Sequence, residues 1–577
     1  MRVFSMTTSG QDRAGLLDRS LQKLERFRRE EEGSLLIFGL FCFVIMLMLA
    51  GVALDLMRFE ERRTVLQNTI DRAALAAADL QQTLPPKEVV KDYFRKAGLT
   101  PPTDDQITVV NGNNGSSRKV SIAVAETVPT WFMKMAGVSS LSAPGVSTAE
   151  ESVGQIEISL ILDVSGSMNG SRLTNLKPAA KSFVDQMFDS TEADKISISI
   201  IPYATQVSLS DNLMSYFNVT NEHASSNCIE FEPSKGDFTT TAVSFGFNPT
   251  DRVYQRNGHF DPFYKASGPR LFNCAPEADR EILPFSSDRQ ALKDYIDGLQ
   301  AEGNTSIDLG MKWGAALLDP SMQGVVNSMA DNGDLPEATR GRPYSYTNGQ
   351  VMKIIVLMTD GANTTEYKLR DAYDHGVSRV WRNTSFTDPW NGINSDVDQY
   401  SFYDASKNKW YVPEIDQWLD HPWGSGTYQE TTCSKKWGCS TSTKNDTGYN
   451  GTNMAVQLTW PEVWQRISIY YLADNIIYKA YDSSSTRNKW RPGSTSNPEV
   501  NTYVYGAKDD QTRALCDAAK AQDVRIYTIA FEAPWQGQQL LSQCASSDAS
   551  HYEVEGLDIE DAFSGIVQSI NKLRLTH

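Results

Sequence analysis

The sequence predicts an α/β protein with an N-terminal transmembrane helix, a small α+β stalk, and a doubly wound parallel sheet that carries two large insertions. Three observations predict this class. An uncharged run of twenty residues lies at 35–54, apolar runs ending in Asp163 and Asp360 alternate with amphipathic stretches, and two long polar and aromatic segments interrupt the alternation. A chain of 577 residues also exceeds what one hydrophobic core supports, so several domains are expected.

The apolar run at 35–54 is long enough to cross about 30 Å of hydrocarbon as a helix. A buried core helix would usually keep a polar stripe, and a cleaved signal peptide would begin earlier and end in a small-x-small site. We therefore expect a cytoplasmic segment at 1–33 and an uncleaved single-pass transmembrane helix at 34–56. Lys and Arg are more numerous before the run than after it, which predicts a cytoplasmic N-terminus.

Residues 57–152 predict a stalk of one helix and a small sheet. Helical spacing of apolar residues continues to about position 78. Pro85-Pro86 lie a few residues further on and prevent the helix from continuing. A short helix at 87–97 and strands at 106–110, 119–125 and 139–147 are expected next. A long helix followed by a small sheet is the outline of a pilin, and a plain membrane-proximal α+β stalk explains the pattern equally well.

Residues 153–577 predict the doubly wound domain. Continuous apolar strands alternate there with amphipathic helices, which is typical of a parallel sheet covered on both faces. The predicted strands lie at 156–163, 195–203, 353–360, 524–531 and 551–554, and the predicted helices at 173–188, 288–299, 307–318, 512–522, 538–544 and 557–573.

Two segments, at 204–285 and 362–506, do not fit this alternation and are predicted to be insertions at loop positions. Aromatic side chains crowd the second insertion. They form either a small core of its own or an exposed binding face. The tryptophans concerned are Trp381, Trp390, Trp410, Trp418, Trp423 and Trp437.

Six of the seven cysteines lie outside the membrane run, an even number that predicts three disulfides in an oxidising compartment. A metal site is a poor alternative, because no C-x2-C pair occurs and the six histidines are scattered. Pairing between sequence neighbours is the simplest of the fifteen possible connectivities. The candidates are Cys228, Cys274, Cys433, Cys439, Cys516 and Cys544.

Five oxygen-bearing side chains are predicted to converge on a divalent cation. Ligands of parallel sheets bind beyond the carboxyl ends of the strands. Two predicted strands end in an aspartate at this edge, and the segment Gly303–Asp308, just before a predicted helix, can reach the same edge. Oxygen donors suit Mg2+, Ca2+ or Mn2+ rather than Zn2+. Because three of the donors are neutral hydroxyls, the ion would stay electropositive and accept a carboxylate from a protein ligand. The five donors are Asp163, Ser165, Ser167, Thr305 and Asp360.

The order of these motifs resembles the von Willebrand factor A domain. DVSGS at 163–167, NTS at 304–306 and TDG at 359–361 are similar to its metal-ion-dependent adhesion site. The resemblance implies a Rossmann-like fold in which Ser165, Ser167 and Thr305 contact the metal. It also implies that Asp163 and Asp360 act directly or through water.

A second resemblance covers nearly the whole chain outside the insertions. The anchor GSLLIFGLFCFVIMLMLAGVALDLMR, the segment QNTIDRAALAAA, and the C-terminal VRIYTIAFEA, HYEVEG and NKLRL resemble the TadG family of Flp (tight-adherence) pilus assembly. This implies a bacterial inner-membrane protein with TadE-like and TadF-like pseudopilins as partners, and a C-terminal domain that is periplasmic or exposed at the surface. Prepilin processing is not expected, since Phe38 stands where that signal has Glu.

Several functional classes are disfavoured by the sequence. A formal charge of −17 argues against nucleic acid as a partner, and no G-x-S-x-G, H-E-x-x-H or G-x4-G-K-[ST] motif supports an enzyme. The leading interpretation is a membrane-anchored, metal-dependent protein-binding component of pilus assembly and adhesion. The alternatives are an adhesin at the pilus tip or cell surface that binds an external ligand, and a membrane-tethered sensor or scaffold unrelated to pili.

Overall fold

The structure is a computed structural model of the whole chain, and it describes residues 32–79, 82, 84–111, 117–152, 154–246, 251–266, 268–348, 350–383, 400–446, 455–492, 500–504 and 506–574. The chain divides into two compact units, at 1–153 and 154–577. Most of the predicted cytoplasmic segment at 1–33 lies outside the described residues, as does Trp390.

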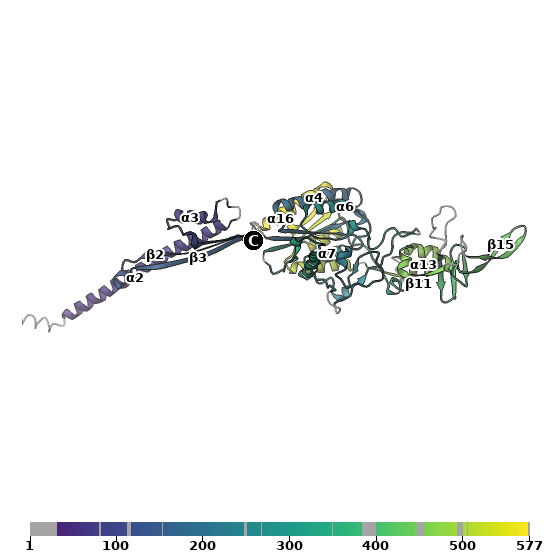
Figure 1. Cartoon of the computed structure of the whole chain (residues 1–577), viewed down its shortest axis with the longest axis horizontal. Helices are drawn as coiled ribbons and strands as arrows, with labels where there is room; N and C mark the ends of the chain where they lie inside the picture. The colour runs from purple at the N-terminus through teal and green to yellow at the C-terminus, as the bar shows by residue number, and fades with distance from the viewer. Residues whose placement is uncertain are drawn as a thin grey trace, which may run out of the picture. The chain divides into compact units, whose positions relative to one another are not determined.

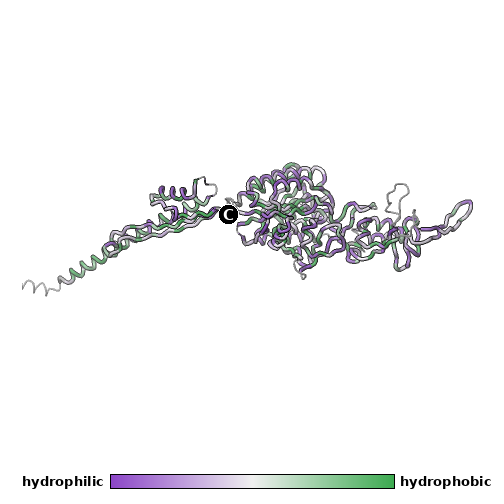
Figure 2. The backbone as a smooth tube through the Cα atoms, viewed as in Figure 1, coloured by the Kyte–Doolittle hydropathy of each residue, from purple (hydrophilic) through white to green (hydrophobic). Residues whose placement is uncertain are grey.

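The first unit begins with α2 (Glu32–Ala78), whose N-terminal part is apolar and mostly exposed (Figure 2). It is the one helix in the described part of the chain that is long and apolar enough to cross a membrane. The helix α3 (Pro86–Lys96) and the 3-10 turn η1 (Asp104–Gln106) follow it. The antiparallel sheet β1-β2-β3 consists of β1 (Ile107–Asn111), β2 (Ser117–Pro129) and β3 (Ser140–Ser152), with the 3-10 turn η3 (Met133–Ala136) between the last two strands.

The core of this unit forms where α2 packs against the sheet. Leu66, Ile70 and Ala73, which have helical spacing in the sequence, are buried there with Val120 and Ile122 of β2. The predicted long helix and small sheet are therefore both present, and β2 and β3 are longer than the alternation indicated.

The second unit is built on a six-stranded sheet with the order β20-β19-β9-β4-β5-β8. All neighbouring strands are parallel except the edge strand β8, which is antiparallel to β5, so the prediction of an all-parallel sheet is wrong at this edge. The strand β8 also lies at the end of the segment predicted as the first insertion. The strands are β4 (Gln155–Asp163), β5 (Ile196–Tyr203), β8 (Leu283–Ser286), β9 (Val351–Thr359), β19 (Arg525–Phe531) and β20 (His551–Val554).

Helices cover both faces of this sheet (Figure 1). Because side chains alternate along a strand, Leu160 and Ile161 of β4 enter two separate hydrophobic cores. One core contains α4 (Ser171–Ser190), α6 (Arg289–Gly298) and α16 (Ile559–Arg574). The other contains α7 (Ile307–Ala316), α8 (Gln323–Asn332), α14 (Lys508–Ala521) and α15 (Trp535–Cys544).

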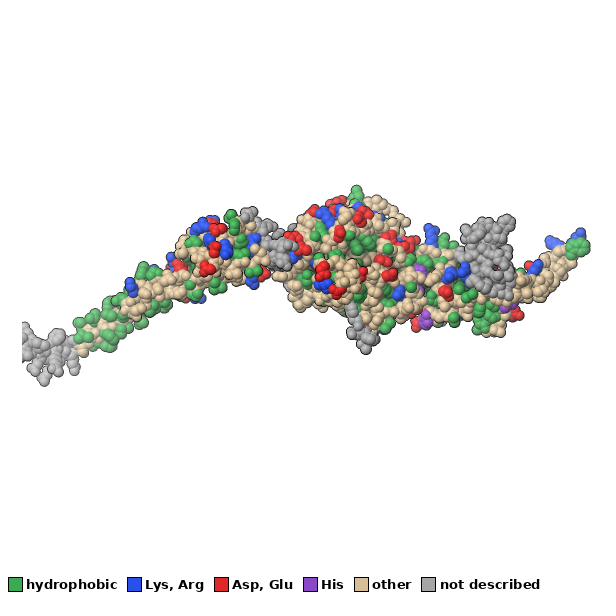
Figure 3. All heavy atoms as spheres, viewed as in Figure 1, with side chains coloured by type: hydrophobic (Ala, Val, Ile, Leu, Met, Phe, Trp, Pro, Cys, Tyr) green, Lys and Arg blue, Asp and Glu red, His purple; other side chains and the backbone are tan. Residues whose placement is uncertain are grey.

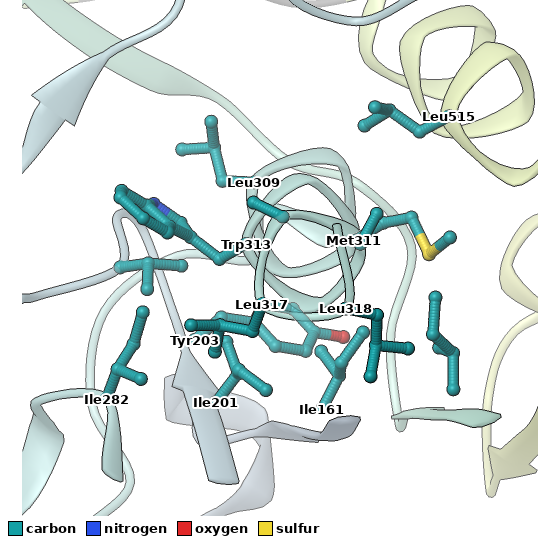
Figure 4. Close-up of a cluster of buried hydrophobic side chains, with 14 of the residues drawn as sticks. Ile161, Ile201, Tyr203, Ile282, Leu309, Met311, Trp313, Leu317, Leu318 and Leu515 are labelled. Carbon is teal, nitrogen blue, oxygen red and sulfur yellow. The ribbon is translucent and has the colours of Figure 1, made fainter. Parts of the chain in front are cut away.

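The helix α7 lies unusually close to the sheet, and all ten of its residues are buried. A Cβ at Gly314 would lie 2.3 Å from Ile161 Cδ1, and one at Gly310 would lie 2.8 Å from the ring of Tyr203. Figure 4 shows Ile161 and Tyr203 beneath the helix, with Trp313 beside it. This close packing places the N-terminus of α7 beside the carboxyl ends of β4 and β5.

The second insertion has a sheet of its own, with the order β14-β13-β12-β11-β17. Its core contains Trp460, Trp464 and Trp490, and Trp423 is buried in a smaller cluster, whereas Trp437 is 82% exposed. Its helices include α10 (Trp460–Trp464) and α13 (Ser484–Trp490). Its strands are β10 (Glu366–Leu369), β11 (Val377–Asn383), β12 (Tyr400–Asp404), β13 (Lys409–Val412), β14 (Gln417–Leu419), β15 (Thr427–Ser434), β16 (Gly438–Asn445), β17 (Ala455–Thr459) and β18 (Asn501–Val504).

Three disulfides join the six cysteines outside the apolar run, in the predicted neighbour pairing. They are Cys228–Cys274, Cys433–Cys439 and Cys516–Cys544. Cys42 in α2 is free.

Candidate metal centre

The loop that follows β4 forms the first part of the predicted site. Asp163 ends the strand, and its Oδ1 accepts a hydrogen bond of 2.8 Å from the backbone N–H of Ser165. This bond folds the loop back on the strand end, so that the hydroxyls of Ser165 and Ser167 lie 3.0 Å apart. The Ser167 hydroxyl in turn donates to Asp360 Oδ1 at 2.7 Å, which joins this loop to the end of β9.

The segment before α7 supplies the third loop. Gly303, with a φ of +89°, accepts a hydrogen bond of 2.9 Å from Gly166 N–H through its carbonyl oxygen. Thr305 is held by its backbone, since its N–H donates to Thr364 Oγ1 at 2.8 Å and its carbonyl oxygen accepts from Thr364 N–H at 2.9 Å. A Cβ at Gly361 would lie 3.6 Å from Thr305 Oγ1, so the Thr305 hydroxyl lies beside the loop that contains Asp360.

The two carboxylates of this edge are buried close together. Burial, and then the nearby charge of Asp360, raises the pKa of Asp163 to about 7. Burial also raises the pKa of Asp360, and hydrogen bonds from Ser167 and Arg172 oppose that increase. Among the described residues no Lys, Arg or His pairs with Asp163, whose Oδ2 instead accepts a 2.6 Å hydrogen bond from Thr359 Oγ1. A cation at this edge would relieve the repulsion between the two carboxylates.

The donor set fits a hard divalent cation. It consists of two carboxylates and three hydroxyls, and oxygen ligands of this kind suit Mg2+, Ca2+ or Mn2+. Asp163, Ser165, Thr305 and Asp360 are buried, whereas Ser167 is exposed and opens this edge to solvent. The hydrogen bonds connect the three loops, and the identification of a metal site here stays a prediction.

The structure adds a positive charge that motif reading did not predict. Arg172, in the first turn of α4, lies with Nη1 2.6 Å from Asp360 Oδ2 and Nε 2.8 Å from Glu532 Oε2. The guanidinium therefore neutralises part of the negative charge of Asp360. It also links Asp360 to Glu532, the residue that follows β19. Arg172 and Glu532 are 360 residues apart in sequence, and no local pattern indicates their pairing.

A second group of possible ligands lies among the described residues outside these loops. Ligand atoms of Glu222, Asp374 and His375 lie within 4.8 Å of one another. The amide of Gln255 donates to both carboxylates, at 3.2 Å and 2.7 Å, which accounts for their proximity without a metal.

Comparison with known proteins connects the N-terminal part of the chain to pili. Residues 33–80 match the family model described as "Putative Flp pilus-assembly TadE/G-like". This family is one of pilus-assembly proteins and not of enzymes. No curated protein matches the chain.

Several of the similar solved structures are pilus proteins, and their sequence identity to this chain is low. The von Willebrand factor domain of the type V pili tip protein Mfa5 from Porphyromonas gingivalis is 12% identical, with a TM-score of 0.29, over 73% of this chain and 97% of that one. The pilus adhesin SpaC from Lactobacillus rhamnosus GG is 10% identical, with a TM-score of 0.27, over 81% and 34%. The adhesive tip pilin GBS104 from Group B Streptococcus agalactiae is 11% identical, with a TM-score of 0.25, over 72% and 100%. TM-scores this low carry no argument about function.

Proposed function

We propose that this protein is a membrane-anchored, pilus-associated adhesive protein that binds a protein ligand through a divalent cation. The observation that carries the proposal is the meeting of three loops at one sheet edge, with Ser167 joined to both Ser165 and Asp360 by hydrogen bonds. The remaining support comes from the family match at 33–80 and from the apolar exposed part of α2.

The large unit is, in this proposal, a doubly wound, Rossmann-like von Willebrand factor A domain. Its support is the sheet, in which four neighbouring strand pairs are parallel and helices cover both faces. In such sheets ligands bind beyond the carboxyl ends of the strands, where Asp163 and Asp360 lie.

In this proposal Ser165, Ser167 and Thr305 hold the cation directly, and Asp163 and Asp360 hold it directly or through water. Mg2+ is the expected ion, with Ca2+ or Mn2+ as alternatives. When bound, it would supply a positive charge for a carboxylate of the protein ligand, which would approach from the solvent side at Ser167.

The proposed location is the bacterial inner membrane. The helix α2 would be a single-pass anchor with a cytoplasmic N-terminus, and the large unit would be periplasmic or displayed at the surface. The three disulfides support an oxidising compartment for that unit. TadE-like and TadF-like pseudopilins are the expected assembly partners, and nucleic acid is not.

The substitution Thr305→Val tests the metal's role with little disturbance of the fold. It removes one hydroxyl, while the backbone bonds of Thr305 to Thr364 remain available. Thr174→Val is the matched control, because within the described part of the chain its exposed hydroxyl donates only to the carbonyl oxygen of Gly170, the N-cap residue of α4. We expect Thr305→Val to weaken Mg2+ binding in calorimetry and adhesion of cells, with the control unchanged. Normal Mg2+ binding and adhesion by the Thr305 variant would refute the proposal.

A second candidate function is adhesion through the tip of the hairpin formed by β15 and β16. This hairpin is exposed except at its base, where Tyr428 and Glu430 are half-buried, and Cys433–Cys439 closes its tip. The tip presents Trp437, with Lys436 Nζ 5.1 Å from its ring centroid. Exposed tryptophans of this kind are favoured at binding interfaces. Adhesion that survives chelation of divalent cations and is lost in Trp437→Ser would favour this candidate.

Protease treatment of intact cells separates an assembly component from a displayed adhesin. A protein confined to the inner membrane stays protected, whereas one displayed on the pilus is cleaved. Unchanged pili and adhesion after deletion of the gene would instead favour the membrane-tethered sensor or scaffold.

A further inference from the structure

The connection between β2 and β3, residues 130–139, is bound to the helix α2 through a buried carboxylate. Asp55 accepts hydrogen bonds from the backbone N–H groups of Trp131, Phe132 and Met133, at 2.9, 2.8 and 2.8 Å. Three donors satisfy most of the hydrogen-bonding capacity of the carboxylate. Asp55 follows the apolar run directly, so this connection is held at the level where the run ends.

Two further contacts hold the connection to the same face of α2. A Cβ at Gly51 would lie 2.4 Å from Phe132 Cγ, so the ring of Phe132 lies directly on the helix backbone. The guanidinium carbon of Arg58 lies 3.7 Å from the ring centroid of Trp131. Gly51, Asp55 and Arg58 have spacings of four and three residues, which place them on one helix face.

The outer surface of this connection is apolar. Trp131 is 61% exposed, Met135 is 76% exposed, and Phe132 and Val138 are also exposed. The exposed apolar surface of α2 continues past the run to Met57, and Figure 3 shows apolar side chains along the first part of this helix. Apolar surface of this kind, contiguous with a membrane helix, needs an apolar partner.

We propose that residues 130–139 form a membrane foot that lies in the same lipid interface as the end of the transmembrane helix. The inference rests on the proposed membrane anchor. The occupant of this surface is lipid, because Gly51, which contacts the foot, belongs to the apolar run itself. A run of twenty residues spans about 30 Å as a helix, so the end of the run and the foot lie at the hydrocarbon boundary. Tryptophan is enriched at that depth.

Depth-dependent fluorescence quenching tests the foot in the full chain. In a Cys42→Ser background, Met135→Cys would be labelled with an environment-sensitive dye and the protein placed in phosphatidylcholine nanodiscs. The lipids would carry a spin-label quencher near the headgroup or near the bilayer centre. We expect several-fold stronger quenching of this label by the shallow quencher than by the deep one.

Val146→Cys is the matched control, since Val146 is an exposed apolar residue of the same hairpin. Its carbonyl oxygen accepts a hydrogen bond from Gln67, twelve residues beyond Asp55 and so about 18 Å further along the helix. We expect its label to escape both quenchers. Equal quenching at Met135 and Val146, or none at either, would overturn the foot.

A third label separates failure of the foot from failure of the anchor. Leu47→Cys lies inside the apolar run, and its label should be quenched most by the deep quencher. Quenching at Leu47 without quenching at Met135 would refute the foot and retain the anchor, leaving the apolar surface for a neighbouring protein. Absence of quenching at Leu47 would refute the anchor itself. In the Asp55→Leu variant, which removes the three hydrogen bonds, quenching at Met135 should fall while quenching at Leu47 persists.

Discussion

Replacing Lys508 by methionine would measure how much stability is lost when the buried carboxylate of Asp308, close to the candidate metal loops, lacks its positively charged partner. Lys508, which is almost fully buried at the start of α14, lies with Nζ 3.5 Å from Asp308 Oδ1. It also donates to Ser306 Oγ at 2.5 Å and to the Thr364 carbonyl oxygen at 3.2 Å. Neither carboxylate oxygen of Asp308 has a hydrogen-bond partner among the described residues. Loss of one partner of a buried ion pair costs about 3–5 kcal/mol, and Lys508→Met should destabilise α7 by that amount.

The destabilisation caused by Lys508→Met should depend on pH. Burial raises the pKa of Asp308 to about 6, and the charge of Lys508 opposes that increase. A carboxyl with a folded-state pKa above its unfolded value is favoured in its protonated form by folding, so its contribution to stability falls as the pH rises from about 4 to about 6. Without Lys508 the pKa rises further. The destabilisation should therefore be largest above about pH 7 and should shrink toward about pH 5, where Asp308 binds a proton.

Hydrogen exchange of the α7 amides is the suitable assay, because a protein with several cores does not unfold in one step. The double variant Lys508→Met/Asp308→Leu is the control, since replacement of both partners by apolar groups is often nearly neutral. We expect faster exchange in the single variant and recovery in the double variant. Exchange in the single variant that matches wild type at high pH, or a double variant as destabilised as the single one, would refute the reasoning.

Three further predictions follow from the packing of the large unit. Gly314→Ala should destabilise it by about 1–3 kcal/mol, measured by hydrogen exchange of the α7 amides, and Ile161→Val should restore part of the loss, because the added methyl lies 2.3 Å from Ile161 Cδ1. Removal of the Cys516–Cys544 disulfide, which closes a loop of 28 residues, should cost about 3.5 kcal/mol, measured by hydrogen exchange of the α14 and α15 amides without reductant. Arg172→Gln should strengthen Mg2+ binding in calorimetry, since the positive charge 2.6 Å from a proposed ligand is removed; weaker binding would contradict this.

The elements with strong periodicity could be predicted from the sequence alone. The run at 156–163 is the strand β4, and the amphipathic stretch at 557–573 is the helix α16. The predicted core face of the long helix, including Leu66 and Ile70, is buried. In these segments the local pattern determines the secondary structure, because only a helix or a strand of that period brings all the apolar side chains to one face, where they can be buried together.

The antiparallel edge strand β8 shows where local pattern was insufficient. Its four residues LPFS are too few for a period of two to be recognised, and only pairing with β5 establishes it as a strand. The exposed tip at Trp437 is another case, since composition alone did not separate the aromatics of a core from one that projects into solvent.

Local patterns in the sequence identify the oxygen-bearing side chains at strand ends and the limits of the apolar run. Which groups compensate the buried charges depends instead on the folded arrangement of the chain. Arg172 with Glu532, Lys508 with Asp308, and Asp55 with the backbone of residues 131–133 are contacts between segments far apart in the chain. The physical reason is that a buried charge is compensated by whatever group the fold brings within a few ångströms, and that proximity has no signature in local periodicity.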